Sequence, residues 1–383
     1  MEIPQQSFSF LTATRIEFGA QKASTIGREA ASFGARALLV CGATADRAEK
    51  LLANSPVSTH TFSIPSEPTT DDVIRGTALA RQSACDLVIA VGGGSVIDAG
   101  KAISAMLTND GELFDYLEVI GRGKPLSRRT VPFIAVPTTA GTGAEVTKNA
   151  VLRSVEHRVK VSMRSNYMLP DLAIIDPELT YSVPPAVTAA TGLDALTQVI
   201  EPFVSQKSNS LTDALCREGI RRAARSLRSA FDEGDNPGAR EDMALTSLFG
   251  GIGLANAGLG AVHGIAGPMG GMFPIPHGVI CGRLLPSVFA ANAAEACKTK
   301  PLRRKFAEVS ALLTGRQTAT VEEGIQWLND LCTHLNITGF SSYGVTETDI
   351  PAIVAAAEKA SSMKGNPVRL TTEKLTDILR RSL

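Results

Sequence analysis

Residues 86–107 read DLVIAVGGGSVIDAGKAISAML. The apolar run Asp86–Val91 predicts a buried strand, three glycines follow it, and Ser95–Leu107 predicts a helix. A helix that opens directly after a strand and a glycine turn can hold a pyrophosphate through its free backbone N–H groups. A tight turn without a ligand would use the same residues, so this stretch predicts an α/β fold but leaves its role open.

Strand and helix patterns alternate on both sides of this stretch. Further strands are expected at Ala37–Cys41, His60–Ile64, Pro132–Val136 and Leu172–Ile175, and helices at Thr44–Ala53 and Thr70–Gln82. Short apolar strands that alternate with helices indicate βαβ units and a mostly parallel sheet. An α/β domain is therefore expected over residues 1–183.

The pattern changes at Pro184, after which long helical spacings dominate. Helices are expected at Leu211–Phe231, Arg240–Leu254, Val321–Leu335, Pro351–Ser361 and Thr371–Arg381. We therefore expect an all-α domain over residues 184–383. A cleft between two such domains is a usual place for a ligand.

Composition excludes several classes of protein. The 38 basic and 38 acidic side chains cancel, which argues against a nucleic acid or an anionic membrane as the main partner. No stretch is apolar enough to span a membrane, and the N-terminus lacks the pattern of a signal peptide. The six cysteines show no CxxC spacing and are expected to be free thiols in a reducing compartment. We therefore expect a cytoplasmic protein.

A second glycine-rich loop follows the strand predicted at Pro132–Val136. Residues Pro137–Thr147 read PTTAGTGAEVT, so several hydroxyl groups and small residues stand side by side. Such a loop suits a ribose or a flat ring better than a packing role. Its alternative is a turn capped by its own hydroxyl groups.

Two of the five histidines have a distinctive context. His263 and His277 are each followed by glycine, and the segment GIAGPMGGMFPIP between them is expected to be loop-like. Asp194 and Gln198 lie four residues apart in a helical run, so their side chains share a face. These four side chains can meet at one cation. The alternative is a pair of buried histidines with structural hydrogen bonds.

Four motifs carry a family resemblance. They are GGGSVIDAGKA at Gly92–Ala102, PTTAGTGAEVT at Pro137–Thr147, IIDPEL at Ile174–Leu179 and GLDAL at Gly192–Leu196. In this order and spacing they closely resemble the iron-containing (type III) alcohol dehydrogenases. The resemblance implies a Rossmann-like α/β domain followed by an all-α domain, the dehydroquinate synthase-like fold. It also implies NAD or NADP, a small alcohol or aldehyde substrate, and a homodimer or larger homo-oligomer.

The resemblance also assigns cofactor residues by position. They are Gly42, Gly93, Gly94, Ser95, Asp98, Thr138, Thr139, Thr142, Lys160 and Leu179. Gly94 and Ser95 are expected at the pyrophosphate, and the later residues around the nicotinamide and its ribose. Gly42 stands where family members that favour NAD usually carry Asp, whose carboxylate repels a 2′-phosphate. With Arg47 nearby, the hypothesis is that NADP(H) is tolerated or preferred.

The resemblance further implies a divalent metal, with iron or zinc expected. Asp194, His263 and His277 match three ligand positions and are the expected catalytic residues, while Gln198 stands at the fourth, usually a histidine. An amide oxygen is a neutral and harder donor than imidazole. A cation held there would act as a Lewis acid while hydride moves to or from nicotinamide C4. Gly267 replaces a second histidine that the family often has, which leaves the proton relay undefined.

Three other functions remain open from the sequence. A metal-independent reductase resembling maleylacetate reductase is slightly favoured by Gln198 and Gly267. An elimination enzyme similar to dehydroquinate synthase would recycle NAD without net redox change. A nucleotide-binding protein that has lost catalysis would keep the fold alone, and turnover of NAD(P)H would exclude it.

Overall fold

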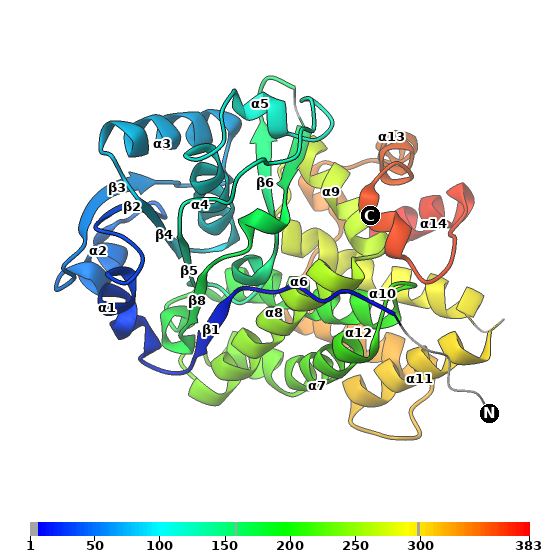
Figure 1. The fold of residues 1–383 in the computed structure, drawn as a ribbon. Helices are drawn as coiled ribbons and strands as arrows, with labels where there is room; N and C mark the ends of the chain where they lie inside the picture. The colour runs from blue at the N-terminus through cyan, green and yellow to red at the C-terminus, as the bar shows by residue number, and fades with distance from the viewer. Residues whose placement is uncertain (1–6, 158, 297–298) are drawn as a thin grey trace. The chain divides into compact units, whose positions relative to one another are not determined.

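The computed structural model describes residues 7–157, 159–296 and 299–383, which form two compact units (Figure 1). The α/β unit is Thr12–Val183. The helical unit is Pro184–Leu383 together with the chain up to Leu11. Asn256 ties this first segment to the helical unit, because its amide accepts the backbone N–H of Leu11 at 2.6 Å and donates to the Leu11 carbonyl at 2.7 Å. The predicted fold class, a parallel sheet domain followed by a helical one, is confirmed.

A six-stranded parallel sheet forms the centre of the α/β unit, in the order β1-β8-β5-β4-β2-β3. Its strands are β1 (Arg15–Phe18), β2 (Arg36–Cys41), β3 (Ser58–Ser63), β4 (Leu87–Gly92), β5 (Phe133–Pro137) and β8 (Leu172–Ile175). The helices are α1 (Ile26–Ala30), α2 (Asp46–Leu52), α3 (Thr70–Gln82), α4 (Gly94–Met106) and α5 (Leu113–Tyr116). The five predicted strands are all present, with ends shifted by at most two residues. Because every pair is parallel, all carboxyl ends lie at one edge.

Both faces of the sheet are covered by helices. In β4, Val88 and Ala90 join a core that includes residues of α3 and α4, whereas Ile89 and Val91 join a core with α1 and α2. Successive side chains of a strand point to opposite faces, so a sheet buried on both sides requires an unbroken apolar run. This is why the sequence pattern predicted these strands so closely.

The structure adds strands that the sequence analysis missed. The short strand β1 lies at the sheet edge and carries charged residues, so it shows no apolar run. Strands β6 (Asn149–Ser154) and β7 (Val159–Arg164) form a separate antiparallel hairpin. Buried and exposed residues alternate along β6, since only one face is covered.

A buried charge cluster joins helix α4 to strand β6. The Nζ atom of Lys101 is fully buried, donates to Thr147 Oγ1 and the Asn149 carbonyl at 2.8 Å each, and lies 3.5 Å from Asp98 Oδ1. Glu145, in the short 3-10 turn Ala144–Val146, is also buried near Lys101. Burial raises the pKa of the Glu145 carboxyl to about 7.

The helical unit is built from nine described helices. They are α6 (Pro185–Val204), α7 (Ser210–Asp232), α8 (Pro237–Ala257), α9 (Ala261–Met272), α10 (His277–Ala296), α11 (Lys300–Thr314), α12 (Val321–His334), α13 (Ile350–Ala357) and α14 (Thr372–Ser382). Within the described ranges, no single helix is long and apolar enough to cross a membrane. The pair α8 and α9, bent by 99° between them, passes that test together by length and composition.

One structural prediction in this unit was wrong. The glycine-rich segment after His263 was expected to be loop-like, but helix α9 continues through it to Met272. Ile265, Ala266 and Met269 are fully buried, and this burial outweighs the low helix propensity of the glycines and of Pro268.

Helix α10 packs unusually close to α6 at two glycines one turn apart. A Cβ atom on Gly278 would lie 2.0 Å from the carbonyl oxygen of Ala190. A Cβ atom on Gly282 would lie 2.4 Å from Leu193 Cδ1. Any side chain at Gly278 would therefore force the two helices apart.

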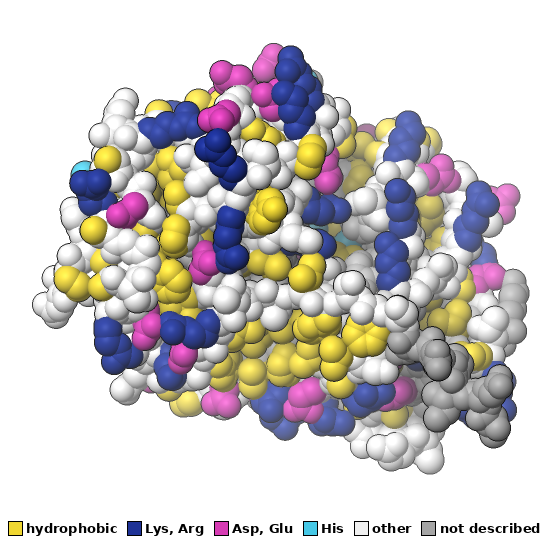
Figure 2. All heavy atoms as spheres, in the orientation of Figure 1, with side chains coloured by type: hydrophobic (Ala, Val, Ile, Leu, Met, Phe, Trp, Pro, Cys, Tyr) yellow, Lys and Arg dark blue, Asp and Glu magenta, His cyan; other side chains and the backbone are white. Residues whose placement is uncertain are grey.

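Acidic and basic side chains are mixed over the face of the molecule that Figure 2 shows, with hydrophobic side chains between them. The mixture agrees with the zero net charge of the chain.

Gly278→Ala is expected to lower the free energy of unfolding by about 1–3 kcal/mol, because the new methyl group meets backbone rather than a flexible side chain. Urea unfolding followed by circular dichroism measures this change. Gly238→Ala in the first turn of α8 is the matched control, since its Cβ has only an ordinary 3.7 Å contact. Equal stability of the two variants would contradict the close packing of α10 on α6.

Glu145→Gln is expected to flatten the pH dependence of stability. The ordinary carboxyl pKa of 4.5 is raised to about 7 in the folded protein. The stabilisation is therefore complete below pH 4.5 and is lost as the pH rises through 7, by an amount on the order of 3 kcal/mol. Urea unfolding at about pH 5.5 and about pH 8 should show a smaller loss for the variant. The exposed Glu156→Gln is the control, and an unchanged pH dependence in Glu145→Gln would refute the assignment.

Candidate active site

One face of helix α6 carries three buried polar side chains. Asp194, Gln198 and Glu201 are spaced by four and three residues, which places them on one side of an α-helix. All three are at most 5% exposed, and carboxylates this deep in a protein require partners. The Cβ atom of Gln198 faces α8, 3.0 Å from where a Cβ on Gly250 would lie. This face of α6 forms the base of the site.

The two carboxylates of this face hold the ring of His263, which lies in α9. Its Nδ1 atom is 2.7 Å from Glu201 Oε2, and its Nε2 atom is 3.1 Å from Asp194 Oδ1. The other oxygen of Glu201 accepts the backbone N–H of Val262 at 2.7 Å. Glu201 therefore fixes both the first turn of α9 and the orientation of the imidazole ring.

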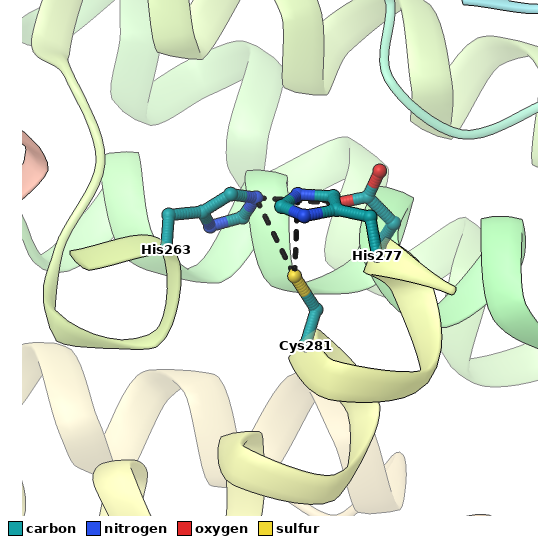
Figure 3. Close-up of side chains that lie close together, drawn as sticks. His263, His277 and Cys281 are labelled. Atoms are coloured by element: carbon teal, nitrogen blue, oxygen red, sulfur yellow. Dashed lines mark hydrogen bonds and ion pairs between the residues drawn. The ribbon is translucent and has the colours of Figure 1, made fainter. Parts of the chain in front are cut away.

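Helix α10 supplies two further side chains, one turn apart. Cys281 Sγ is 3.6 Å from Nε2 of His277 and 3.8 Å from Nε2 of His263. His277 Nε2 is 3.9 Å from Asp194 Oδ1. Figure 3 shows His263, His277 and Cys281 pointing toward one another. One ligand atom from each of these four residues lies within 4.8 Å of the other three.

Charges in this cluster stabilise one another. Burial disfavours every charged form, yet His263 and His277 hold the pKa of the Asp194 carboxyl below its usual value. Burial lowers the pKa of His263, but Cys281 and Asp194 raise it well above 6.5. The two histidines also lower the pKa of the buried Cys281 thiol. In each case the neighbouring groups oppose the effect of burial on the pKa.

These donors fit a divalent metal ion. Imidazole nitrogen, carboxylate oxygen and thiolate sulfur are ligands that zinc uses in proteins, and two imidazoles with one carboxylate also suit iron(II). Because Nδ1 of His263 is bonded to Glu201, its Nε2 atom is the one directed at the cluster. The structure therefore brings Asp194, His263 and His277 together as the sequence predicted.

Two residues of the site were missed from the sequence. Cys281 lies one turn after His277, so the two share a face of α10. Glu201 lies seven residues after Asp194, on the same face of α6. Both signals were present as helical spacings, but free cysteines and glutamates are too common on helices to stand out alone.

Most of the predicted cofactor residues lie at the carboxyl edge of the sheet. Gly42 follows β2, Gly94 follows β4, Thr142 follows β5 and Leu179 follows β8. The two glycine-rich loops adjoin, since Thr138 N–H donates to the Gly92 carbonyl at 3.0 Å. Gly94 is required here, because a Cβ would lie 2.6 Å from Thr142 Oγ1.

The start of helix α4 lies within this group of loops. Gly93 is the N-cap and the helix begins at Gly94, so its first backbone N–H groups are available next to Ser95. A Cβ on Gly93 would lie 3.3 Å from Thr139 Oγ1, so the glycine gives the second loop room to lie close to the first. A helix N-terminus between two polar loops is suited to a pyrophosphate and its ribose.

Three other predicted residues have partners within the protein. Asp98 accepts the backbone N–H of Val151 at 3.0 Å, and Lys160 forms an ion pair with Glu67 at 2.5 Å. Arg47 donates to Ser182 Oγ at 3.2 Å and to the Glu178 carbonyl at 3.4 Å, next to Leu179. His60, His157 and His334, which the sequence left without a role, lie outside the four-residue cluster.

Comparison with known proteins identifies the family. A family described as iron-containing alcohol dehydrogenase matches residues 13–177, and the C-terminal family of the Fe-containing alcohol dehydrogenases matches residues 188–383. The 1,3-propanediol dehydrogenase of Klebsiella pneumoniae is 34% identical over 391 residues, covering 98% of each chain.

Solved structures give the same result. A crystal structure of 1,3-propanediol oxidoreductase matches with a TM-score of 0.91 and 34% identity over 99% of this chain and all of the other. Sulfoacetaldehyde reductase from Bifidobacterium kashiwanohense, in complex with NAD+, matches with a TM-score of 0.89 and 28% identity over 99% of each chain.

The predicted class of enzyme, an oxidoreductase that acts on an alcohol or aldehyde with a nicotinamide cofactor, is confirmed by these relatives, and the predicted divalent metal agrees with the family. The two matched segments cover nearly the whole chain in one order. The chain belongs to the iron-containing alcohol dehydrogenase family.

Proposed function

We propose that this enzyme interconverts a small alcohol and its carbonyl form by hydride transfer with NAD(H) or NADP(H), using one divalent metal held by the helical unit. The observation that carries the proposal is the convergence of the buried Asp194 and His263 with the half-buried His277 in one cluster. The relatives support it, since one is named as an NAD-dependent methanol dehydrogenase and another as a 1,3-propanediol dehydrogenase.

In this proposal the α/β unit binds the dinucleotide. The N-terminus of α4 at Gly93–Ser95 binds the pyrophosphate through backbone N–H groups and the Ser95 hydroxyl. The hydroxyl groups of Thr138, Thr139 and Thr142, on the adjoining loop, orient the ribose and the nicotinamide ring. Asp98 and Lys160, which contact Val151 and Glu67 in the protein, are proposed to lie around the nicotinamide and its ribose.

The helical unit holds the metal. Asp194, His263 and His277 are the ligands, and Gln198 on the same face of α6 is a further candidate. A bound divalent ion supplies Lewis-acid polarisation of the substrate oxygen. Glu201 is a positioning residue, because its bond to Nδ1 of His263 leaves Nε2 facing the cluster.

The proposal also covers the location of the protein in the cell and its oligomeric state. The five described cysteines are free, as in a reducing compartment, while Cys297 lies outside the described residues. We therefore propose a cytoplasmic enzyme. From the family resemblance we propose a homodimer or larger homo-oligomer, and from the zero net charge no nucleic-acid or membrane partner. Cell fractionation and light scattering of the purified protein test the location and the assembly.

Gly42→Asp is expected to move cofactor use toward NAD. Gly42 follows β2, and a Cβ built there meets no atom within 4 Å, so the side chain is accommodated. A new carboxylate would repel the 2′-phosphate of NADPH and lower kcat/KM for NADPH by about 10–100-fold, with little change for NADH. Gly42→Asn is the uncharged control. A wild-type enzyme that already rejects NADPH would exclude the NADP hypothesis.

Asp194→Asn is expected to lower kcat by about 100-fold or more and to weaken metal binding, because the anionic ligand is lost at nearly constant shape. Steady-state kinetics and elemental analysis of the purified variant measure both effects. Asp232→Asn, outside the cluster on α7, is the control. Full activity of a wild-type enzyme that holds no metal would instead support the metal-independent reductase.

A further inference from the structure

Cys281 is the residue of the cluster that the proposed function does not use. Its side chain is fully buried on α10, and its sulfur faces Nε2 of His277 at 3.6 Å and Nε2 of His263 at 3.8 Å. The Nε2 atom of His263 is the nitrogen left for a cation, because Glu201 is bonded to Nδ1. The sulfur therefore lies where a metal bound to these rings would be within its reach.

Four of the six distances between the ligand atoms are known, and they lie near the edges of a tetrahedral zinc site. With Zn–S of about 2.3 Å and Zn–N or Zn–O of about 2.0–2.1 Å, regular edges are about 3.6 Å from sulfur to nitrogen and about 3.3 Å from nitrogen to oxygen. The Cys281 sulfur lies 3.6 and 3.8 Å from the two nitrogens. The Asp194 oxygen lies 3.1 Å from Nε2 of His263 and 3.9 Å from Nε2 of His277. Small movements of these side chains would bring the four ligand atoms to a regular tetrahedral arrangement.

Helix packing holds the sulfur in this position. Gly278 and Gly282 flank Cys281 and bring α10 against α6, whose Asp194 is the opposite ligand. The backbone carbonyl of Gly282 accepts the thiol of Cys332 on α12 at 3.3 Å, a second contact that fixes this turn. Cys281 is therefore placed by rigid elements rather than by a loop.

We propose that Cys281 is a direct thiolate ligand of the metal, and that it completes a site of Asp194, His263, His277 and Cys281 that favours zinc over iron. The inference rests on the proposed function, since it adds a ligand to the same site. Coordination replaces the S–H bond with a sulfur–metal bond and releases the proton to solvent.

The sulfur decides which ion the site prefers. Two imidazoles and one carboxylate with open positions form a donor set typical of iron(II). A fourth, soft ligand that closes a tetrahedron is typical of zinc instead. Zinc can still expand to five ligands when a substrate oxygen binds, so the four protein ligands do not exclude catalysis.

Cobalt(II) substitution tests the inference in the full-length protein. Metal-free enzyme is titrated with cobalt(II), and its near-ultraviolet absorption is recorded together with the number of ions bound per chain. A direct sulfur ligand is expected to produce a thiolate-to-cobalt charge-transfer band in the wild type. Cys281→Ser should lose this band, and its affinity for zinc should fall by at least about tenfold in competition with a chromogenic chelator.

Cys332→Ser is the matched control, since Cys332 is a buried cysteine of the same unit whose sulfur contacts α10 but lies outside the cluster. It should keep the band. One cobalt ion per chain without the band in the wild type would overturn the inference and leave the proposed metal site standing. Failure of the wild type to bind cobalt or zinc at all would overturn both. The wild-type spectrum is decisive even if Cys281→Ser does not fold.

Discussion

The close approach of helix α10 to helix α6 is the contact on which the candidate site depends. At Gly278 there is no room for a side chain, because a Cβ would lie 2.0 Å from the Ala190 carbonyl oxygen. This contact places His277 and Cys281 opposite Asp194, which α6 carries one turn further along. The four ligand atoms then lie within 4.8 Å of one another, close enough to bind one ion. A larger residue at Gly278 would move α10 away from α6, and with it His277 and Cys281 away from Asp194.

In the α/β unit, the parallel sheet likewise brings together residues that are distant in sequence. Parallel strands buried on both faces end at one edge, so loops distant in sequence become neighbours there. Gly94 lets the loop after β4 lie against Thr142 in the loop after β5. Beneath them, the buried Lys101 ties α4 to the β6–β7 hairpin through Thr147 and the Asn149 carbonyl. In both units, the packing of helices and strands brings these polar groups together.

Most strands and helices could be predicted because each leaves a pattern within a short stretch of sequence. A sheet covered on both faces requires continuous apolar strands, so Leu87–Gly92 and its neighbours were visible in the sequence. The missed elements lack that requirement: β1 is a charged edge strand and β6 is covered on one face only. Helix α9 was missed because its glycines and Pro268 argue against a helix, and only burial against other helices reverses that preference.

The sequence by itself determined the class of fold, the family motifs and the residues Asp194, His263 and His277 as candidates, because each depends on residue type and short spacing. Only the tertiary structure decided that Cys281 and Glu201 belong to the same group. The contacts that join Cys281 and Glu201 to His263 on helix α9 span 18 and 62 residues of the chain. Which side chains meet is set by how closely helices pack, and this depends on the absence of a Cβ at positions such as Gly278, which no local pattern reveals.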